Sequence, residues 1–278
     1  MMVKTSVSRL LVGTVFFLAS RWSFALPASP LEESVCGSFT EWFSFRMWSS
    51  LAGKPDTSAF RRMSNVEEIS HVTIDNRTLR GYRINSATPS KGSVLFAQGN
   101  AMLADQVLQS LSQVVDAGFD VVVFDYRGYG QSDGKPRLKA IVSDYVEIAN
   151  AMAKAQPKKL YFYGVSFGGV VLLNTLAAVP PVSGTVIDSS PGTVSDLGCP
   201  SNFDPITHIP DNAGSILVVI GDRDRVVLPS KSAGLARKVV ANGGHVMRRP
   251  DFSHPFMDPD NAVASTRLNI AIDFFNSK

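Results

Sequence analysis

One serine of the chain lies in a sequence context that can turn its hydroxyl into a nucleophile. Ser166 is the centre of segment 164–169, which reads Gly-Val-Ser-Phe-Gly-Gly and follows a short apolar run. The G-x-S-x-G pattern between a strand and a helix is typical of a nucleophile elbow, where the serine projects above the sheet from a strained backbone conformation. A side chain at Gly164 or Gly168 would collide with the neighbouring backbone in such a turn. The segment therefore predicts nucleophilic catalysis by Ser166.

The hydrophobic pattern indicates the elements that would position this serine. From residue 92 onward, short and continuously apolar runs alternate with amphipathic stretches. The apolar runs predict strands that are buried on both faces, at 94–97, 121–124, 160–163, 185–187 and 216–220. The predicted helices lie within 103–114, 141–152, 170–178, 230–241 and 262–275. This alternation predicts an α/β fold with a doubly wound, mostly parallel sheet flanked by helices, in which active residues lie at the carboxyl ends of strands.

The part of the chain before residue 92 has a different pattern. Segment 68–85 predicts a β-hairpin with its turn at Asp75 and Asn76. The preceding stretch is irregular, except for an expected aromatic-rich helix around 42–48 that would pack onto the domain. We therefore divide the chain into an N-terminal extension, 26–67, and a catalytic domain, 68–278.

Residues 1–25 have the pattern of a secretory signal peptide. Two basic residues precede the apolar run 10–19, and Ser23 and Ala25 offer the small side chains that a signal peptidase recognises. Arg21 interrupts the run too early for a membrane-spanning helix. We expect removal of this segment and an exported protein, periplasmic or secreted. A retained membrane anchor and a buried first helix are the alternatives.

Composition narrows the possible partners. The chain has 278 residues, of which 45% are hydrophobic and 18% charged, and this balance predicts a globular protein with a sizeable core. Apart from the basic leader the chain is neutral and has no stripe of lysines and arginines, so nothing indicates a nucleic-acid partner.

Export would place Cys36 and Cys199 where disulfides persist. The sequence leaves a disulfide and two buried free thiols equally open.

From about Glu68 to its end, the chain resembles the α/β-hydrolase superfamily. Besides the elbow, four segments carry the resemblance. Segment 75–81 is similar to the opening hairpin of the family, and segment 98–101 follows the strand after which the family has its oxyanion loop. Segment 124–132 is similar to the family's D-Y-R-G-Y-G-x-S turn, and segment 221–227 is similar to the loop of its catalytic acid. The branch it resembles contains depalmitoylase-like thioesterases, monoacylglycerol-lipase-like esterases and related secreted bacterial hydrolases.

A serine nucleophile needs a base that takes its proton and a carboxylate that orients the base. The resemblance implies the chain order serine, acid, histidine. It favours His254, in the loop before the final helix, over His245, which we expect to cap a turn before an edge strand. It places the acid at Asp224. Asp222, in the same loop, and Asp188, after a core strand, remain alternatives.

The oxyanion of the reaction needs two backbone N–H donors. The Phe167 amide supplies one by its position directly after the nucleophile. The resemblance implies that Asn100 or Ala101 supplies the other. Gln98 stands where the family usually has a histidine, which leaves the second donor open. Arg127 is expected to belong to the framework of its loop.

The short segment 191–215 leaves room for only a minimal lid, so we expect an open site for a small-molecule or acyl-chain ester. The first hypothesis is a serine hydrolase that cleaves carboxylic ester or thioester bonds through an acyl-enzyme, using Ser166, His254 and Asp224. This chemistry needs no metal and no organic cofactor. A serine peptidase or an acyltransferase would use the same residues. The alternative of another class is an inactive, hydrolase-like binding module, which only Gln98 favours.

Overall fold

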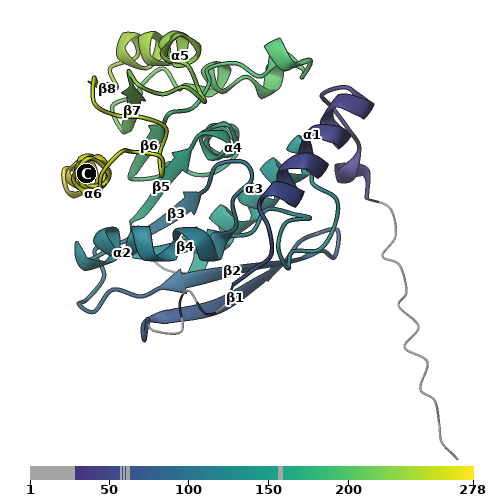
Figure 1. Ribbon diagram of the computed structural model, residues 1–278, viewed down its shortest axis with the longest axis horizontal. Coiled ribbons are helices and arrows are strands. Elements are labelled where there is room, and N and C mark those ends of the chain that lie inside the picture. The colour runs from purple at the N-terminus through teal and green to yellow at the C-terminus, as the bar shows by residue number, and fades with distance from the viewer. Residues whose placement is uncertain (1–28, 57, 59, 61–62, 156–158) are drawn as a thin grey trace, which may run out of the picture.

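The computed structural model describes residues 29–56, 58, 60, 63–155 and 159–278 (Figure 1). The predicted signal peptide lies outside these residues, so its removal and the export of the protein stay predictions. The boundary that we place between extension and catalytic domain also stays a prediction.

Eight strands form one sheet in the order β1-β2-β4-β3-β5-β6-β7-β8 (Figure 1). The hairpin strands β1 and β2 are antiparallel, β2 is antiparallel to β4, and all other neighbours are parallel. The strands are β1 Val66–Val72, β2 Thr78–Ile84, β3 Ser93–Ala97, β4 Asp120–Phe124, β5 Leu160–Val165, β6 Gly184–Asp188, β7 Ile216–Gly221 and β8 His245–Arg249. Every residue of β3, β4, β6 and β7 is buried, as their continuous apolar runs predicted. The doubly wound, mostly parallel sheet is thus confirmed.

Helices cover both faces of the sheet. The helices are α1 Ser38–Leu51, α2 Leu108–Asp116, α3 Leu138–Ala155, α4 Phe167–Leu176, α5 Pro229–Ala241 and α6 Asn261–Asn276. Val94 and Phe96 of β3 pack with α2 and α6, whereas Leu95 and Ala97 pack with α1, α3, α4 and α5. This alternation follows from the two-residue period of a strand, which points successive side chains to opposite faces.

Two predicted helices differ from the observed ones. The stretch 103–114 is divided into a 3-10 turn, Ala104–Val107, and the helix α2. The side chain of Gln106 accepts a hydrogen bond from the Leu103 amide and thereby closes this first turn. The helix predicted at 170–178 begins earlier, because α4 starts directly after Ser166. We expected His245 to cap a turn. It is instead the first residue of β8.

The segment before the sheet is fastened to the rest of the chain. The expected aromatic-rich helix is present as α1, and Phe45 on its inner side is buried in the core. A disulfide joins Cys36, just before α1, to Cys199 in the connection between β6 and β7. That connection contains only the 3-10 turns Ser195–Leu197, Ser201–Phe203 and Pro205–His208, so the lid is as small as expected. Within the described residues, no helix is both long and apolar enough to cross a membrane.

A fully buried arginine holds the N-terminal turns, the hairpin and α3 together. The Arg127 guanidinium forms ion pairs with Asp144 in α3, with Asp75 in the hairpin turn at 2.5 Å and with Glu32 at 3.4 Å. Glu32 also pairs with Arg77 at 2.9 Å. Because a buried charge is tolerated only with partners, these residues form one framework. Arg127 thus has the structural place that the sequence indicated.

Candidate active site

Ser166 lies at the sharp turn between β5 and α4. Its backbone has φ 54° and ψ −118°, a conformation in which an L-residue is strained. A Cβ atom at Gly164 would lie 2.7 Å from the Gly168 carbonyl oxygen, and one at Gly168 would lie 1.9 Å from the Ala97 oxygen. Both contacts are too short for any side chain, so the turn requires glycine at both positions. The backbone of this elbow is the one that its sequence pattern predicted.

His254 and Asp224 meet although 30 residues separate them in the chain. His254 Nδ1 lies 2.9 Å from Asp224 Oδ2, and both side chains are buried. Burial by itself would raise the pKa of the Asp224 carboxyl, but the hydrogen bond with His254 and the amides of Val226 and Val227 hold that pKa below its usual value. The ionised carboxylate can only accept, so Nδ1 donates the hydrogen bond. The other ring nitrogen, Nε2, is then the one that can take a proton.

The alternative residues have other partners. Asp222 forms an exposed ion pair with Arg248 at 2.6 Å. Asp188 is fully buried and pairs with Arg267 at 2.7 Å. His245 is exposed on the edge strand, where its ring contacts Phe274. The structure therefore brings only the pair Asp224 and His254 together among the candidates for acid and base.

The described part of the structure contains no hydrogen bond between the Ser166 hydroxyl and His254. A chain of other contacts joins their loops. The Ser166 amide donates to the Asp188 carbonyl at 2.9 Å. The Asp188 carboxylate pairs with Arg267, which also donates to the carbonyl of Ser253, the residue before His254, at 2.7 Å. In enzymes without bound substrate the bond from nucleophile to base is often long, and it shortens when substrate binds.

Arg267 is a site residue that sequence reasoning missed. It donates to Asp258 through Nε at 2.8 Å and through Nη2 at 3.0 Å, in addition to its bonds to Asp188 and Ser253. Its guanidinium carbon lies 4.2 Å from the centre of the Phe252 ring. Burial raises the pKa of Asp188, although the ion pair with Arg267 opposes this rise. No sequence signal pointed to Arg267, because an arginine in the middle of a C-terminal helix is usually exposed.

The loop after β3 lies against the nucleophile. A methyl group added to Gly99 would lie 3.6 Å from the Ser166 Cβ atom. Ala101 in the same loop has a positive φ of 57°, which is unusual for a residue with a side chain. Phe167 is the first residue of α4, and amides in the first turn of a helix have no acceptor within the helix. Phe167 follows Ser166 directly, and Gly99, the residue before Asn100, lies against it. The function of Phe167, Asn100 and Ala101 as an oxyanion hole stays a prediction.

Gln98 has a structural contact that accounts for its place in the loop. The side chain is fully buried, and its amide nitrogen donates to the Phe124 carbonyl at the end of β4, at 2.9 Å. The Tyr126 hydroxyl donates to the Gln98 carbonyl at 2.5 Å. These bonds fix the start of the loop to the neighbouring strand. Because oxyanion donors are backbone amides, a glutamine here is compatible with the reaction.

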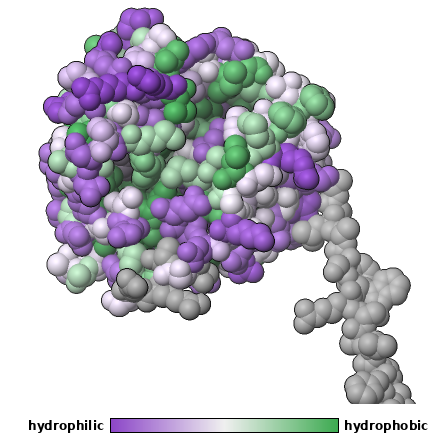
Figure 2. Space-filling view, viewed as in Figure 1, coloured by the Kyte–Doolittle hydropathy of each residue, from purple (hydrophilic) through white to green (hydrophobic). Residues whose placement is uncertain are grey.

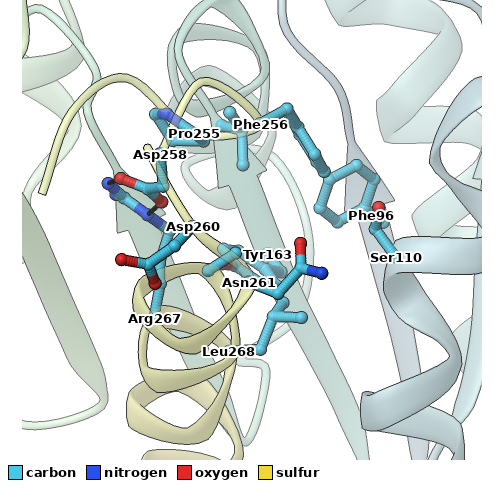
Figure 3. Close-up of a pocket in the computed structure, with 12 residues that line it drawn as sticks. Phe96, Ser110, Tyr163, Pro255, Phe256, Asp258, Asp260, Asn261, Arg267 and Leu268 are labelled. Carbon is cyan, nitrogen blue, oxygen red and sulfur yellow. Dashed lines mark hydrogen bonds and ion pairs between the residues drawn. The ribbon is translucent and has the colours of Figure 1, made fainter.

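A cavity of about 210 Å³ lies beside the site, between β3, β5, α2, α6 and the loop of His254. Val165, the residue before Ser166, and Pro255, the residue after His254, both line it. Figure 3 shows the rings of Phe96 and Phe256 together at one end. Acidic side chains and Arg267 line the other end. Within the described residues, no cluster of histidine, cysteine and acidic side chains is suited to hold a metal ion.

Known serine hydrolases share this architecture. The esterase Pf2001 of Pyrococcus furiosus superimposes with a TM-score of 0.62 at 17% identity, over 76% of this chain and 92% of the esterase. A Xanthomonas campestris serine hydrolase described as lacking a lid gives a TM-score of 0.59 at 19% identity, over 76% of this chain and 94% of that protein. The sequence profile of the family described as serine aminopeptidase, S33, matches residues 88–205, which include the elbow. The chain thus has an α/β-hydrolase fold.

Curated relatives match this chain over part of their length. The polyketide transferase claH of Penicillium crustosum is 31% identical over 126 residues, which are 41% of each chain. The lysophosphatidylserine lipase ABHD12 of Danio rerio is 34% identical over 84 residues, which are 29% of this chain and 22% of the lipase. The chain thus spans less than half the length of each of these two relatives. The profile match ends before Asp224 and His254, whose proximity is an observation of the structure alone.

Proposed function

We propose that this protein is a serine hydrolase that cleaves carboxylic ester or thioester bonds through an acyl-enzyme intermediate. The observation that carries the proposal is the 2.9 Å contact between His254 Nδ1 and Asp224 Oδ2. It occurs at the edge of the sheet where β5 ends in the strained Ser166 elbow. The fold is shared with an esterase and with a serine hydrolase without a lid, and both support this class of reaction.

In the first half of the reaction, Ser166 Oγ attacks the carbonyl carbon of the ester while its proton passes to His254 Nε2. Asp224 orients the ring and stabilises the positive charge that develops on it. The bond between the carbonyl carbon and the leaving oxygen or sulfur then breaks. The leaving group takes the proton from His254 and departs as an alcohol or thiol.

In the second half, water attacks the acyl-enzyme. His254 takes a proton from the water, and the bond to Ser166 Oγ breaks as that oxygen regains a proton. The carboxylic acid is released and the free enzyme is restored. In both halves the negative oxygen would be held by the Phe167 amide and by the amide of Asn100 or Ala101.

The cavity beside the site is a suitable place for the part of the substrate next to the reacting carbonyl. Its walls include Val165 and Pro255, which are the chain neighbours of the proposed nucleophile and base. The aromatic end, formed by Phe96 and Phe256, would accept an apolar group by burial. Substrates with an acyl chain short enough to fill this cavity are therefore expected to react best when they are freely dissolved.

The test is covalent labelling with a fluorophosphonate probe, followed by intact-mass analysis. We expect one adduct on the purified chain and none on Ser166→Ala. Ser189→Ala is the matched control, because Ser189 also follows a core strand with a positive φ, of 52°, but its hydroxyl donates to the Asp188 carboxylate. The adduct should persist in that variant. Absence of an adduct on folded protein would favour the inactive binding module instead.

Acyl transfer to an acceptor other than water is the second candidate. One relative is described as a polyketide transferase, and transfer would use the same acyl-enzyme. A panel of p-nitrophenyl esters of different chain length, assayed with and without added alcohols, separates the two reactions. Release of free acid in the presence of alcohols supports hydrolysis, whereas formation of new esters supports transfer.

A further inference from the structure

The outer side of α1 is apolar and unpartnered. Five of its large apolar side chains are exposed, Phe39 by 73% and Leu51 by 68%, and they are Phe39, Trp42, Phe43, Met47 and Leu51. We call these five residues the outer face of α1. The inner side of the same helix packs Phe45 into the core, so α1 has large apolar side chains on both sides. Exposed apolar side chains that group on one surface mark a contact with a protein partner or with a membrane. Figure 2 shows hydrophobic side chains gathered over this part of the molecule.

The contacts of α1 place it across the active-site edge of the sheet. The Cys36–Cys199 disulfide ties its beginning to the short lid. Phe45, in its middle, contacts the ring of Phe167, the residue after the nucleophile, with ring centres 5.6 Å apart. At its end, the carbonyl of Ala52 accepts a hydrogen bond from Gln106, just beyond the loop after β3, at 2.8 Å. The helix α1 therefore lies beside the Ser166 elbow at this edge of the sheet.

Other exposed apolar side chains continue around the same edge. They belong to the short lid, to the loop of the proposed acid and to the loop of the proposed base: Leu197, Val226, Leu228, Phe256 and Met257. We call these five residues the apolar rim. All of them follow the carboxyl ends of β6, β7 or β8. The outer face of α1 and the apolar rim thus lie at the edge of the sheet that carries the candidate site, and Phe256 of the rim lines the cavity beside that site.

The charges of α1 favour contact with lipid. Its acidic residue, Glu41, is buried and binds the amides of Val35, Cys36 and Leu138. The charged residue that α1 exposes is Arg46, a cation. Tryptophan, phenylalanine and leucine beside a basic residue are typical of helices that lie in the interface between lipid and water. An exposed face without acidic side chains is not repelled by anionic headgroups.

A second copy of the chain is a poorer occupant of this surface. A helix of 14 residues is about 21 Å long and about 10 Å wide, so its face offers on the order of 200 Å². A stable dimer buries about 800 Å² on each partner. A partner copy that covered the apolar rim as well would cover Phe256, which lines the cavity beside the site. A lipid surface needs no minimum area of this kind, and it can supply the substrate to the cavity beside the site.

We propose that the outer face of α1 and the apolar rim dock onto a lipid surface, and that the ester or thioester substrates are molecules whose acyl chains lie in that surface. The docking is a property of the surface residues, whereas the substrate class rests on the proposed function. The docked enzyme takes an acyl chain from the lipid into the cavity beside the site, past Phe256, without exposing that chain to water. Freely dissolved short esters remain substrates, but they gain nothing from docking.

The experiment measures which tryptophan of the full chain enters lipid. One variant keeps Trp42 alone, through Trp22→Phe and Trp48→Phe. Its matched control keeps Trp48 alone, through Trp22→Phe and Trp42→Phe. Trp48 lies on the same helix but is half-buried, and its ring packs on Phe45 with centres 5.4 Å apart. Vesicles of phosphatidylcholine with brominated acyl chains quench only indoles that enter the bilayer.

We expect a blue shift and a loss of most of the Trp42 emission on vesicle addition, with little change for Trp48. Adding Phe43→Glu to the first variant should abolish the quenching, because a carboxylate resists transfer into lipid. The leader cannot produce these signals, since Trp22 is absent from both variants. Trp42 emission that stays unquenched overturns the proposal. So does a dimer in sedimentation analysis that Phe43→Glu dissociates, because a second copy then covers the face.

Hydrolysis of dissolved p-nitrophenyl acetate by the same variants separates this inference from the proposed function. Quenching without hydrolysis retains the docking and rejects the enzyme. Hydrolysis without quenching retains the enzyme and rejects the docking. If both hold, the rate on a long-chain ester should rise when that ester is presented in vesicles, and Phe43→Glu should remove the rise while the rate on the acetate stays unchanged.

Discussion

Asp222 and Asp224 lie two positions apart in one loop, and the structure gives them unrelated surroundings. Asp224 accepts from two backbone amides and from His254, and it is 3% exposed. Asp222 is a surface residue that pairs with Arg248. An exposed ion pair contributes little, because water and salt screen it. The same side-chain chemistry therefore has two different consequences at the scale of single residues.

Replacing either aspartate with asparagine tests this difference. Asp224→Asn should lower kcat by roughly 10⁴-fold, because an amide no longer orients the base or stabilises its charged form. Asp222→Asn should change kcat less than about twofold, since its ion pair is exposed. Both substitutions conserve volume, and thermal unfolding serves as the check of folding. Equal losses in the two variants would contradict the assignment of Asp224 as the acid.

At the scale of elements, α6 positions the loop that carries the base. Arg267 of α6 binds Asp258 and the Ser253 carbonyl on the two sides of His254, and Asp188 at the end of β6. One side chain thereby fixes the loop to the strand whose carbonyl accepts from the Ser166 amide. A loop has few contacts of its own, so such a connection decides where its histidine lies. We regard Arg267 as a positioning residue.

Substitutions of Arg267 should affect the chemical step more than substrate binding. Arg267→Lys keeps the charge but loses the planar fork, so we expect kcat to fall by about 10- to 100-fold with a KM that changes little, as for a small displacement of a catalytic group. Arg267→Gln leaves Asp188 and Asp258 buried without a cation and should cost about 3–5 kcal/mol of unfolding free energy. Lysine should therefore rescue part of the activity that glutamine loses.

Arg249 supplies the control for these variants. Its guanidinium also lies over the Phe252 ring, at 5.4 Å, but it is partly exposed and pairs with Asp251 on the surface. Arg249→Gln should leave kcat unchanged and alter the unfolding free energy by less than about 0.5 kcal/mol. If Arg267→Lys has full kcat while remaining folded, Arg267 contributes only to stability.

At the scale of the whole molecule, an ion-pair framework and a disulfide are among the contacts that hold the N-terminal segment. The framework of Arg127 binds Glu32, and the Cys36–Cys199 disulfide crosses 163 residues of sequence. Together they fasten α1 over the carboxyl edge of the sheet. A cross-link of this span restricts the unfolded chain strongly, because it closes a long loop.

Removal of the disulfide should therefore lower global stability. For the double variant Cys36→Ser and Cys199→Ser, we expect the unfolding free energy to fall by up to about 5 kcal/mol, the chain-entropy value for a loop of this length. Denaturant unfolding in the presence and absence of dithiothreitol measures the effect. The reductant should destabilise the unaltered chain and leave the double variant unaffected. A chain whose unfolding does not respond to reductant would show that the thiols are free in solution.

The sequence by itself determined the sheet and the elbow. Strands buried on both faces require continuous apolar runs, and the serine turn requires glycine at two fixed positions, so both leave a signal within a few residues. The hairpin turn at Asp75 and Asn76 is local in the same way, and Asn76 has the positive φ of 59° that such a turn uses. The boundaries of helices were less certain, as the early start of α4 shows, because neighbouring segments decide where a helix begins.

Only the tertiary structure decided which distant side chains meet. The sequence allowed a disulfide or two free thiols, and the fold brings Cys36 and Cys199 together. Asp224 contacts His254 because β7 and β8 are neighbours in the sheet, so that the loops at their carboxyl ends meet. The place of α1 across the site edge and the partners of Arg267 left no local signal. Such contacts join segments far apart in the chain, and their geometry exists only once the sheet has set the order and register of its strands.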